Sequence, residues 1–140
     1  MAILRALVLL LVFVSPISAV NASEDLKDFL LQFNVLDKYP YHLLDEQYRA
    51  YFRAGEIYLS VGKEELKELY EEQNKHMEEF STRNLTILSR SDSEVFTSVT
   101  YEYDWTAQIG NTTMSGKLTT HSVLEKTEDG WNVLFDAVIQ

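Results

Sequence analysis

The last third of the chain, residues 94–140, alternates between apolar and polar positions as β-strands do. Over 94–108 the odd positions are mostly apolar or aromatic, including Tyr101, Tyr103 and Trp105, and the even positions are mostly polar. Successive side chains of a strand point to opposite faces, so this pattern predicts a strand with one apolar face.

Two further strands are predicted after this one, over 117–126 and 131–140. Gly110 and Gly116 mark the turn before the first, and Asp129-Gly130 supplies the turn before the second. In the last strand simple alternation places Asp136 on the polar, outer face. The opposite, inner face would carry Trp131, Val133, Phe135, Ala137 and Ile139. Together the three strands predict a curved antiparallel sheet with an apolar concave face.

The first half of the chain is predicted to be mainly helical. Leu26, Phe29, Leu30 and Phe33 recur at helical spacing and form one apolar stripe. Gly55 is predicted to end a second, short helix. The predicted elements are a helix over 24–36, a short helix over 43–52, a strand over 56–60, a polar helix over 63–80 and a strand over 82–89.

Composition and charge narrow the classes of function. With 140 residues, 46% of them hydrophobic, the chain suits one globular domain. Its formal net charge of −10 argues against nucleic acid or an anionic membrane surface as a partner. The sequence contains no cysteine, which excludes thiol catalysis, disulfides and thiolate metal sites.

Residues 1–22 are typical of a cleavable signal peptide. Arg5 precedes an apolar run over 6–14, and small residues follow, with cleavage expected after Ala19 or Ala22. An uncleaved anchor is the alternative, although the run is shorter than the roughly 20 residues that a spanning helix needs. We therefore expect a secreted or periplasmic protein with a single domain over residues 23–140 and no membrane association after cleavage.

The order of elements resembles the NTF2-like superfamily, which includes SnoaL-like and ketosteroid-isomerase-like proteins. The likeness depends mainly on the last hairpin, Gly116-Lys117-Leu118-Thr119 followed by Asp129-Gly130-Trp131-Asn132-Val133. It implies an α+β fold in which N-terminal helices pack in a strongly curved antiparallel sheet, or cone. A cystatin-type sheet is the nearest alternative, but the Gln-x-Val-x-Gly loop of cystatins is absent from this sequence.

The resemblance also implies a ligand pocket between the concave face of the sheet and the first helix. Such a pocket would be apolar with a few hydroxyl groups, as small-molecule sites are. The alternative is that the same aromatic side chains fill the core and leave no cavity. The residues expected to line the pocket are Phe29, Phe33, Tyr101, Tyr103, Trp105, His121, Trp131, Val133 and Phe135.

Catalysis is less strongly indicated than binding. Similar enzymes carry acid–base residues at the positions that align with Phe135 and Ala137, and both are apolar here. By resemblance, His121 faces into the cone and could act as a base. Alternatively, His121 forms a hydrogen bond with Tyr101 or Tyr103 and has a structural role.

Other polar candidates have simpler explanations. His42 could lie at the mouth of the cone, whereas His76 is expected to face solvent. Asp45 is expected to cap the second helix, and Asp104 to be solvated or part of a dimer contact. The histidines have no spacing typical of a metal site, and neither a metal nor another cofactor is expected.

The leading hypothesis is a protein that binds a small apolar or aromatic ligand in the cone, acts as a dimerisation module, or does both. A cofactor-free isomerase, cyclase or hydrolase that uses His121 as base is the alternative, and a purely structural protein with a filled cone is a third. Glycans at Asn84 and Asn111 are expected only in a eukaryotic secretory route. A homodimer is expected through an outer apolar patch of Phe96, Leu118, Leu124, Leu134 and Val138.

Overall fold

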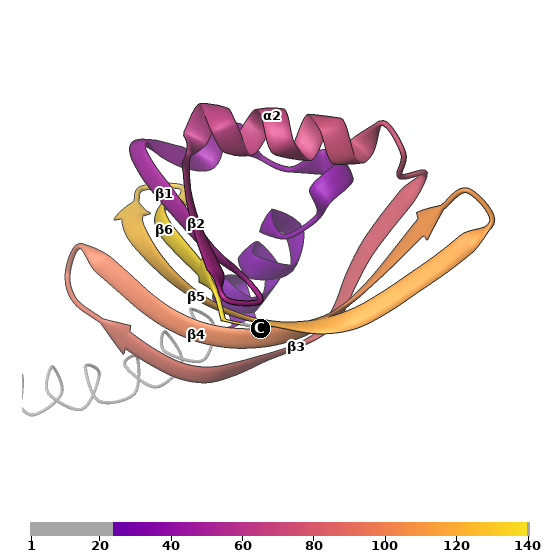
Figure 1. The fold of residues 1–140 in the computed structure, drawn as a ribbon. Coiled ribbons are helices and arrows are strands. Elements are labelled where there is room, and N and C mark those ends of the chain that lie inside the picture. Colours follow the sequence, from indigo (N-terminus) through magenta and orange to yellow (C-terminus); the bar gives the residue numbers. More distant parts are fainter. Residues whose placement is uncertain (1–23, 140) are drawn as a thin grey trace, which may run out of the picture.

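The computed structural model describes residues 24–139, and the predicted signal peptide lies outside them. The chain forms an α+β fold in which a strongly curved sheet of six strands holds an N-terminal helix and α2 on its concave side (Figure 1). This confirms the predicted fold class. The elements are the helix over 24–33, 3₁₀ turns at Leu36–Lys38 and Tyr41–Leu43, β1 (Leu44–Ala54), β2 (Ile57–Gly62), α2 (Lys63–Asn74), β3 (Glu79–Asp92), β4 (Phe96–Ile109), β5 (Thr112–Thr127) and β6 (Gly130–Val138).

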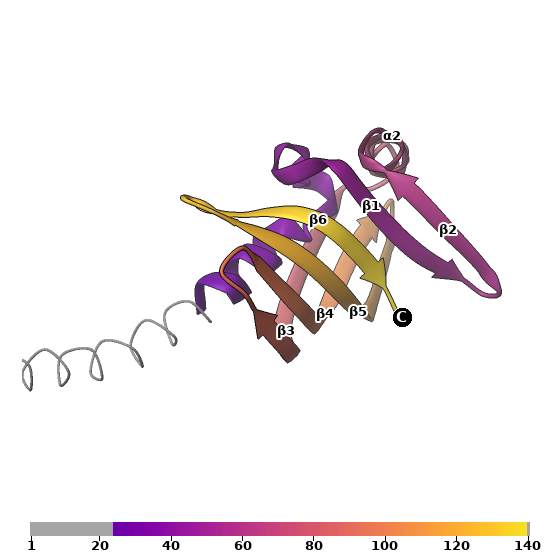
Figure 2. The same cartoon turned by 90° about the vertical axis from the view of Figure 1, so that its left-hand side faces the viewer.

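The strand order is β2-β1-β6-β5-β4-β3. Neighbouring strands are antiparallel except β1 and β6, which are parallel, so the first strand of the chain pairs with the last. Figure 2 shows the β1–β2 hairpin extending beyond the rest of the sheet. Because β1 pairs with β6, side chains from the start and from the end of the domain's sequence lie next to each other on the concave face.

The apolar face predicted for 94–108 is confirmed in β4. Val99, Tyr101 and Tyr103 are buried and pack in one core with Leu30 and Phe33 of the N-terminal helix. Burial of large apolar side chains is the main favourable contribution to folding, at about 1.5–3 kcal/mol each. The core therefore holds the N-terminal helix against the middle of the sheet.

The short helix predicted over 43–52 is wrong, because this segment is strand β1. Leu44, Tyr48 and Ala50 are buried on one face, which fits the period of two of a strand. Leu44, Tyr48 and Phe52 also fit helical spacing, so the pattern alone did not decide between the two. Pairing with β6 and a tight turn at Gly55, whose φ is +65°, fix the strand.

The polar helix predicted over 63–80 is correct at its start but too long. The Glu65 carboxylate accepts a hydrogen bond from the Gly62 backbone N–H at the start of the helix, and α2 ends at Asn74. The Asn74 side chain then donates a 2.8 Å hydrogen bond to the Leu36 carbonyl. Phe80, the last residue of the predicted helix, is instead a buried residue of β3.

The outer apolar patch predicted as a dimer interface does not exist as described. Leu118 pairs with Tyr103, and Leu124 pairs with the buried Thr97. Because side chains directly opposite one another in an antiparallel pair share a face, both leucines belong to the concave side. Val138 does too, opposite the buried Thr120.

Candidate functional site

An irregularity in β6 changes which side chains face the interior of the cone. Val123 of β5 pairs with Phe135, but the next residue, Leu124, pairs with Val133, which leaves one extra residue in β6. Such a bulge reverses the alternation of the residues that follow it. Val133 and Asp136 therefore both face inward, and the prediction that Asp136 faces outward is wrong.

Asp136 is buried and accepts hydrogen bonds on both carboxylate oxygens. The Tyr48 hydroxyl of β1 donates to Oδ2 at 2.7 Å, and the Ser122 hydroxyl of β5 donates to Oδ1. A buried carboxylate is stable only when such donors replace the lost water. The parallel pairing of β1 with β6 and the antiparallel pairing of β5 with β6 bring both donors to Asp136.

Burial raises the pKa of Asp136 to about 6, although the hydrogen bonds from Ser122 and Tyr48 oppose the rise. The loss of solvent disfavours the charged form more than the two donors favour it. Burial together with the Asp136 charge also raises the pKa of Tyr48, so this phenol stays protonated and remains a donor. The site therefore holds a carboxyl that can gain or lose a proton near neutral pH.

A chain of polar side chains continues from Asp136 into the core. The hydroxyls of Ser122 and Tyr101 are 3.1 Å apart, and Asn34 Nδ2 donates to the Tyr101 hydroxyl at 3.1 Å. Asn34 Oδ1 in turn accepts a 3.4 Å hydrogen bond from the Tyr103 hydroxyl. This network connects the end of the N-terminal helix with the carboxyl and holds the aromatic rings of β4 in place.

Asp136 lies in the wall of a pocket of about 400 Å³ between the concave face, the β1–β2 hairpin and α2. Most of the wall is apolar, and its polar groups come from a few side chains. The lining residues are Asn34, Leu36, Tyr39, Tyr48, Phe52, Leu59, Val61, Leu69, Tyr70, Gln73, Phe80, Tyr103, Leu118, Thr120, Asp136 and Val138. We call this space the cone pocket.

Only Tyr103 of the residues predicted to line a pocket lies in the wall of the cone pocket. Phe33, Tyr101 and Val133 face the same interior but belong to the packed core. Phe29 and Trp131 pack against each other, with ring centroids 5.3 Å apart, at a separate shallow depression. Trp105 stacks on Phe80 beside a second apolar pocket.

His121 and Phe135 lie on the outer face of the sheet, so the inward orientation predicted for them is wrong. His121 Nδ1 is 2.7 Å from the Thr100 hydroxyl and its Nε2 is 3.2 Å from the Ser98 hydroxyl. Phe135 packs on the ring of Tyr51, with centroids 5.2 Å apart. Because β5 carries small polar residues on both faces, its alternation did not indicate which face is buried.

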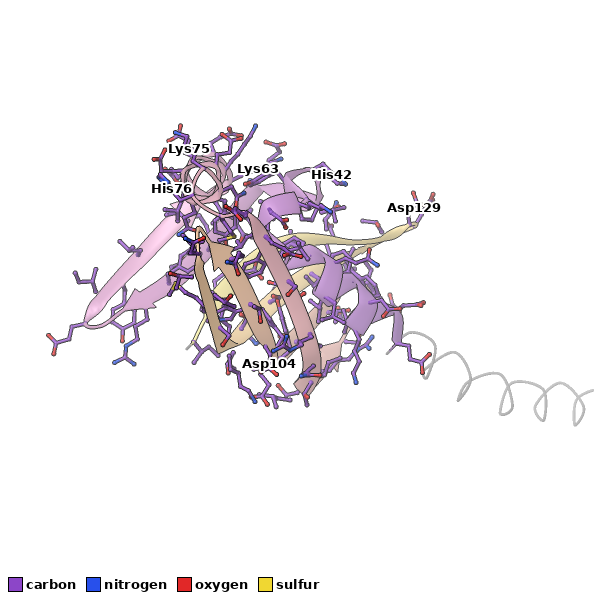
Figure 3. All side chains as sticks on the ribbon, turned by 90° about the vertical axis from the view of Figure 1, so that its right-hand side faces the viewer. His42, Lys63, Lys75, His76, Asp104 and Asp129 are labelled. Carbon is purple, nitrogen blue, oxygen red and sulfur yellow. The ribbon has the colours of Figure 1, made fainter. Side chains whose placement is uncertain are left out.

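The other polar candidates lie apart from the cone pocket. Asp45 is in strand β1 and accepts a hydrogen bond from the Gln47 N–H, so its predicted role as a helix cap is wrong. Figure 3 shows Asp104 on the side of the sheet away from α2, and His76 at the end of α2 beside Lys75. Asp104 accepts a 2.9 Å hydrogen bond from the Asn84 side chain.

Residues 24–139 offer neither a metal-binding group nor a membrane-spanning helix. Within this range no group of three or more His, Asp or Glu side chains is placed to hold a metal ion. None of the helices in the same range is long and apolar enough to cross a membrane.

Sequence reasoning missed the residues at the centre of this site. Asp136 and its donors, Tyr48 and Ser122, were not among the predicted site residues. One signal was present: Asp136 is the single charged residue within Val133–Ile139, and a lone carboxyl in an apolar strand requires a partner. The bulge that turns it inward has no glycine or proline to mark it.

No model of a known protein family and no curated protein matches this sequence. Solved structures with a similar fold do match it. A conserved protein from Planctomyces limnophilus is 14% identical, with a TM-score of 0.64 over 87% of this chain and 97% of that one. An NTF2-like protein of unknown function from Shewanella oneidensis is 18% identical, with a TM-score of 0.54 over 83% and 97%.

A ketosteroid isomerase-like protein from Erwinia carotovora atroseptica is 16% identical, with a TM-score of 0.52 over 71% of this chain and 78% of that one. At such low identity the likeness concerns the fold alone. It agrees with the predicted α+β fold, in which helices pack in a strongly curved sheet. The protein therefore has the NTF2-like fold.

Proposed function

We propose that the cone pocket binds a small, largely apolar molecule, with Asp136 as its polar contact. The observation that carries the proposal is the buried carboxyl of Asp136 in the wall of an otherwise apolar pocket. Small-molecule sites share this combination of apolar walls and a few fixed polar groups. A carboxyl whose pKa is raised by burial within a pocket is also a common mark of a functional site.

Binding of naphthol, an aromatic molecule with one hydroxyl group, tests this proposal. Leu59 lies in the wall of the pocket and is half exposed, so a Leu59→Trp variant should narrow the pocket and still fold. Tyr58→Trp is the matched control, because Tyr58 precedes Leu59 in β2 and does not line the cone pocket. We expect calorimetry to show at least tenfold weaker binding for Leu59→Trp only. Equal affinity for both variants, or no binding to the unmodified protein, would refute the proposal.

Proton-transfer catalysis is a second candidate function. It is supported by the pKa of Asp136, since a carboxyl that titrates near pH 6 can take a proton from a carbon acid and return it. His121, on the outer face, is no longer a suitable base. A cyclic ketone such as tetralone should then exchange its α-hydrogen for deuterium faster with the protein than without it. Loss of the exchange in Asp136→Asn, but not in His121→Ala, would favour the enzyme over a binding protein.

We also retain export and dimerisation as proposals. Export rests on the segment over residues 1–22, and mass spectrometry of the native protein should find Val20 or Ser23 as the first residue. A mature chain that keeps the apolar run would refute it. Dimerisation rests on the outer face around Phe135 and is argued in the Discussion.

A further inference from the structure

A second apolar pocket of about 450 Å³ lies next to the cone pocket, beyond the C-terminal end of α2. Met77, Trp105, Ile109 and Met114 are among the side chains that line it. Met114 and Ile109 are exposed for 48% and 37% of their surface, so this pocket opens to solvent through apolar side chains. We call it the distal pocket.

The two pockets share part of their walls. Leu36, Gln73, Phe80 and Leu118 line both of them. These four shared side chains form the boundary between the two spaces. Met77 at the far side is unbranched and adapts readily to different occupants. The arrangement suits a ligand that is longer than either pocket alone.

The polar groups of the cone pocket define one end of such a ligand. Beside Asp136 the Thr120 side chain lines the pocket, and its buried hydroxyl has no hydrogen-bond partner among the described residues. Burial raises the pKa of the nearby Tyr103 and the Thr120 hydroxyl partly offsets this rise, but the two hydroxyls make no hydrogen bond of ordinary geometry, and Tyr103 donates to Asn34. A buried polar group without a partner is costly, so a ligand that supplies one gains affinity. Once the Thr120 side chain rotates to uncover its buried hydroxyl, a ligand hydroxyl can donate to the Asp136 carboxylate and accept from Thr120 at once.

Charge selects against the other common polar head groups. A ligand carboxylate or phosphate would face the Asp136 carboxyl within a protein of formal net charge −10. Like charges at short range in a buried site repel strongly. A neutral hydroxyl avoids this repulsion and still makes both hydrogen bonds.

We propose that the site takes an elongated amphipathic alcohol, with its hydroxyl between Asp136 and Thr120 and its hydrocarbon chain over Leu118 and Phe80 into the distal pocket. The inference rests on the proposed function of the cone pocket and specifies its ligand class. In this proposal the cone pocket binds the polar head group of the ligand, and the distal pocket selects the length of its hydrocarbon chain.

Calorimetry with straight-chain primary alcohols from hexanol to dodecanol tests the chain length. Each added methylene that leaves water should increase affinity about fourfold. Met114→Trp should block the distal pocket, so it should weaken dodecanol binding by tenfold or more and leave hexanol binding unchanged. Met114→Leu keeps an apolar side chain of similar size and is the control. In a Trp131→Phe background, the emission of Trp105 should change with dodecanol and not with hexanol.

The head group is tested with Thr120→Val, which replaces the hydroxyl with a methyl group of similar size. Dodecanol should bind up to about tenfold more weakly to this variant, which corresponds to one hydrogen bond. Dodecyl chloride, which lacks the hydroxyl, should bind equally to both forms. Dodecanoate should bind more weakly than dodecanol to the unmodified protein at neutral pH.

Several results would overturn the inference and leave the proposed function intact. The first is binding of naphthol without binding of any alcohol, and the second is an affinity that stops rising at short chain lengths. The third is an equal effect of Met114→Trp on the binding of all alcohols. The fourth is dodecanoate binding that is as tight as dodecanol binding. Failure of naphthol to bind would refute the proposed function, and the inference with it.

Discussion

The Tyr48 hydroxyl donates a 2.7 Å hydrogen bond to Asp136, although the two residues lie 88 positions apart in the sequence. The contact depends on the parallel pairing of β1 with β6, which places Ala50 opposite Asp136. It joins the first and last strands through a buried polar contact at the wall of the cone pocket. The ionisation of Asp136 is therefore coupled both to the fold and to the proposed site.

The first prediction concerns the pH dependence of stability. The pKa of Asp136 is about 6 in the folded protein, above the ordinary value near 4 in an unfolded chain. A raised pKa means that the folded state binds the proton more tightly. The stabilisation from the protonated carboxyl is therefore complete below pH 4 and is lost as the pH rises through 6. The loss should be on the order of 3 kcal/mol, at about 1.4 kcal/mol for each pKa unit.

Asp136→Asn should abolish this part of the pH dependence, because an amide does not ionise. Urea unfolding from pH 4 to pH 8 should show that the variant gains stability relative to the unmodified protein as the pH rises. Asp129→Asn, at the exposed turn before β6, is the control and should not change the difference. Parallel stability curves for the unmodified protein and Asp136→Asn would contradict the prediction.

The second prediction concerns the donor. The Tyr48 hydrogen bond lowers the pKa of Asp136, so Tyr48→Phe should raise that pKa above 6, which carbon NMR of the carboxyl can follow. At pH 8 the variant should lose about 1.5–3 kcal/mol of stability, the usual contribution of a hydrogen bond to a charged group. Tyr70→Phe is the control, since Tyr70 lines the same pocket without donating to Asp136. An equal shift in both variants would mean that the hydrogen bond is not the cause.

The general fold could be predicted because long alternating segments specify both a strand and its buried face. In β4 the aromatic residues Tyr101 and Tyr103 indicated which face of the strand is buried, and both side chains are buried in the structure. The likeness of the last hairpin then indicated how the strands are arranged. These signals are local, and each is repeated over many residues.

The site could not be predicted because it depends on single residues and on long-range pairing. One extra residue in β6 turns Asp136 inward, and no local signal specifies it. The face of His121 is set by its pairing with Thr100, since Thr119 and Ser122 give β5 polar side chains on both faces. Tyr48 was assigned to a helix because Leu44, Tyr48 and Phe52 fit both the period of a helix and the period of a strand.

The third prediction concerns the close approach of Gly116 to Trp105. A Cβ atom at residue 116 would lie 2.9 Å from Trp105 Nε1, closer than van der Waals contact allows. Trp105 is also stacked on Phe80, with ring centroids 6.1 Å apart, so the indole has little room to move. Gly116→Ala should therefore cost about 1–3 kcal/mol in stability.

The emission of Trp105, measured in a Trp131→Phe background, should shift in Gly116→Ala as the indole is displaced. Ser115→Ala is the matched control, because Ser115 precedes Gly116 in β5 and its side chain is exposed. If Gly116→Ala keeps both the stability and the emission of its parent, the ring is less constrained than the contacts indicate.

The last prediction concerns dimerisation through the outer face of β1 and β6. Tyr51 is 43% exposed and packs on Phe135, which lies opposite Val123, so three apolar side chains are adjacent on this face. We expect a second copy to cover them and sedimentation at micromolar concentration to show a homodimer. Phe135→Glu should yield monomers, because a carboxylate buried without a partner is strongly unfavourable. Tyr58→Glu, on the exposed β2 strand, should stay dimeric, which separates a local interface from a general effect of added negative charge. A monomeric unmodified protein would refute the dimer, and dissociation of both variants would locate the interface at the β1–β2 hairpin or assign the effect to net charge.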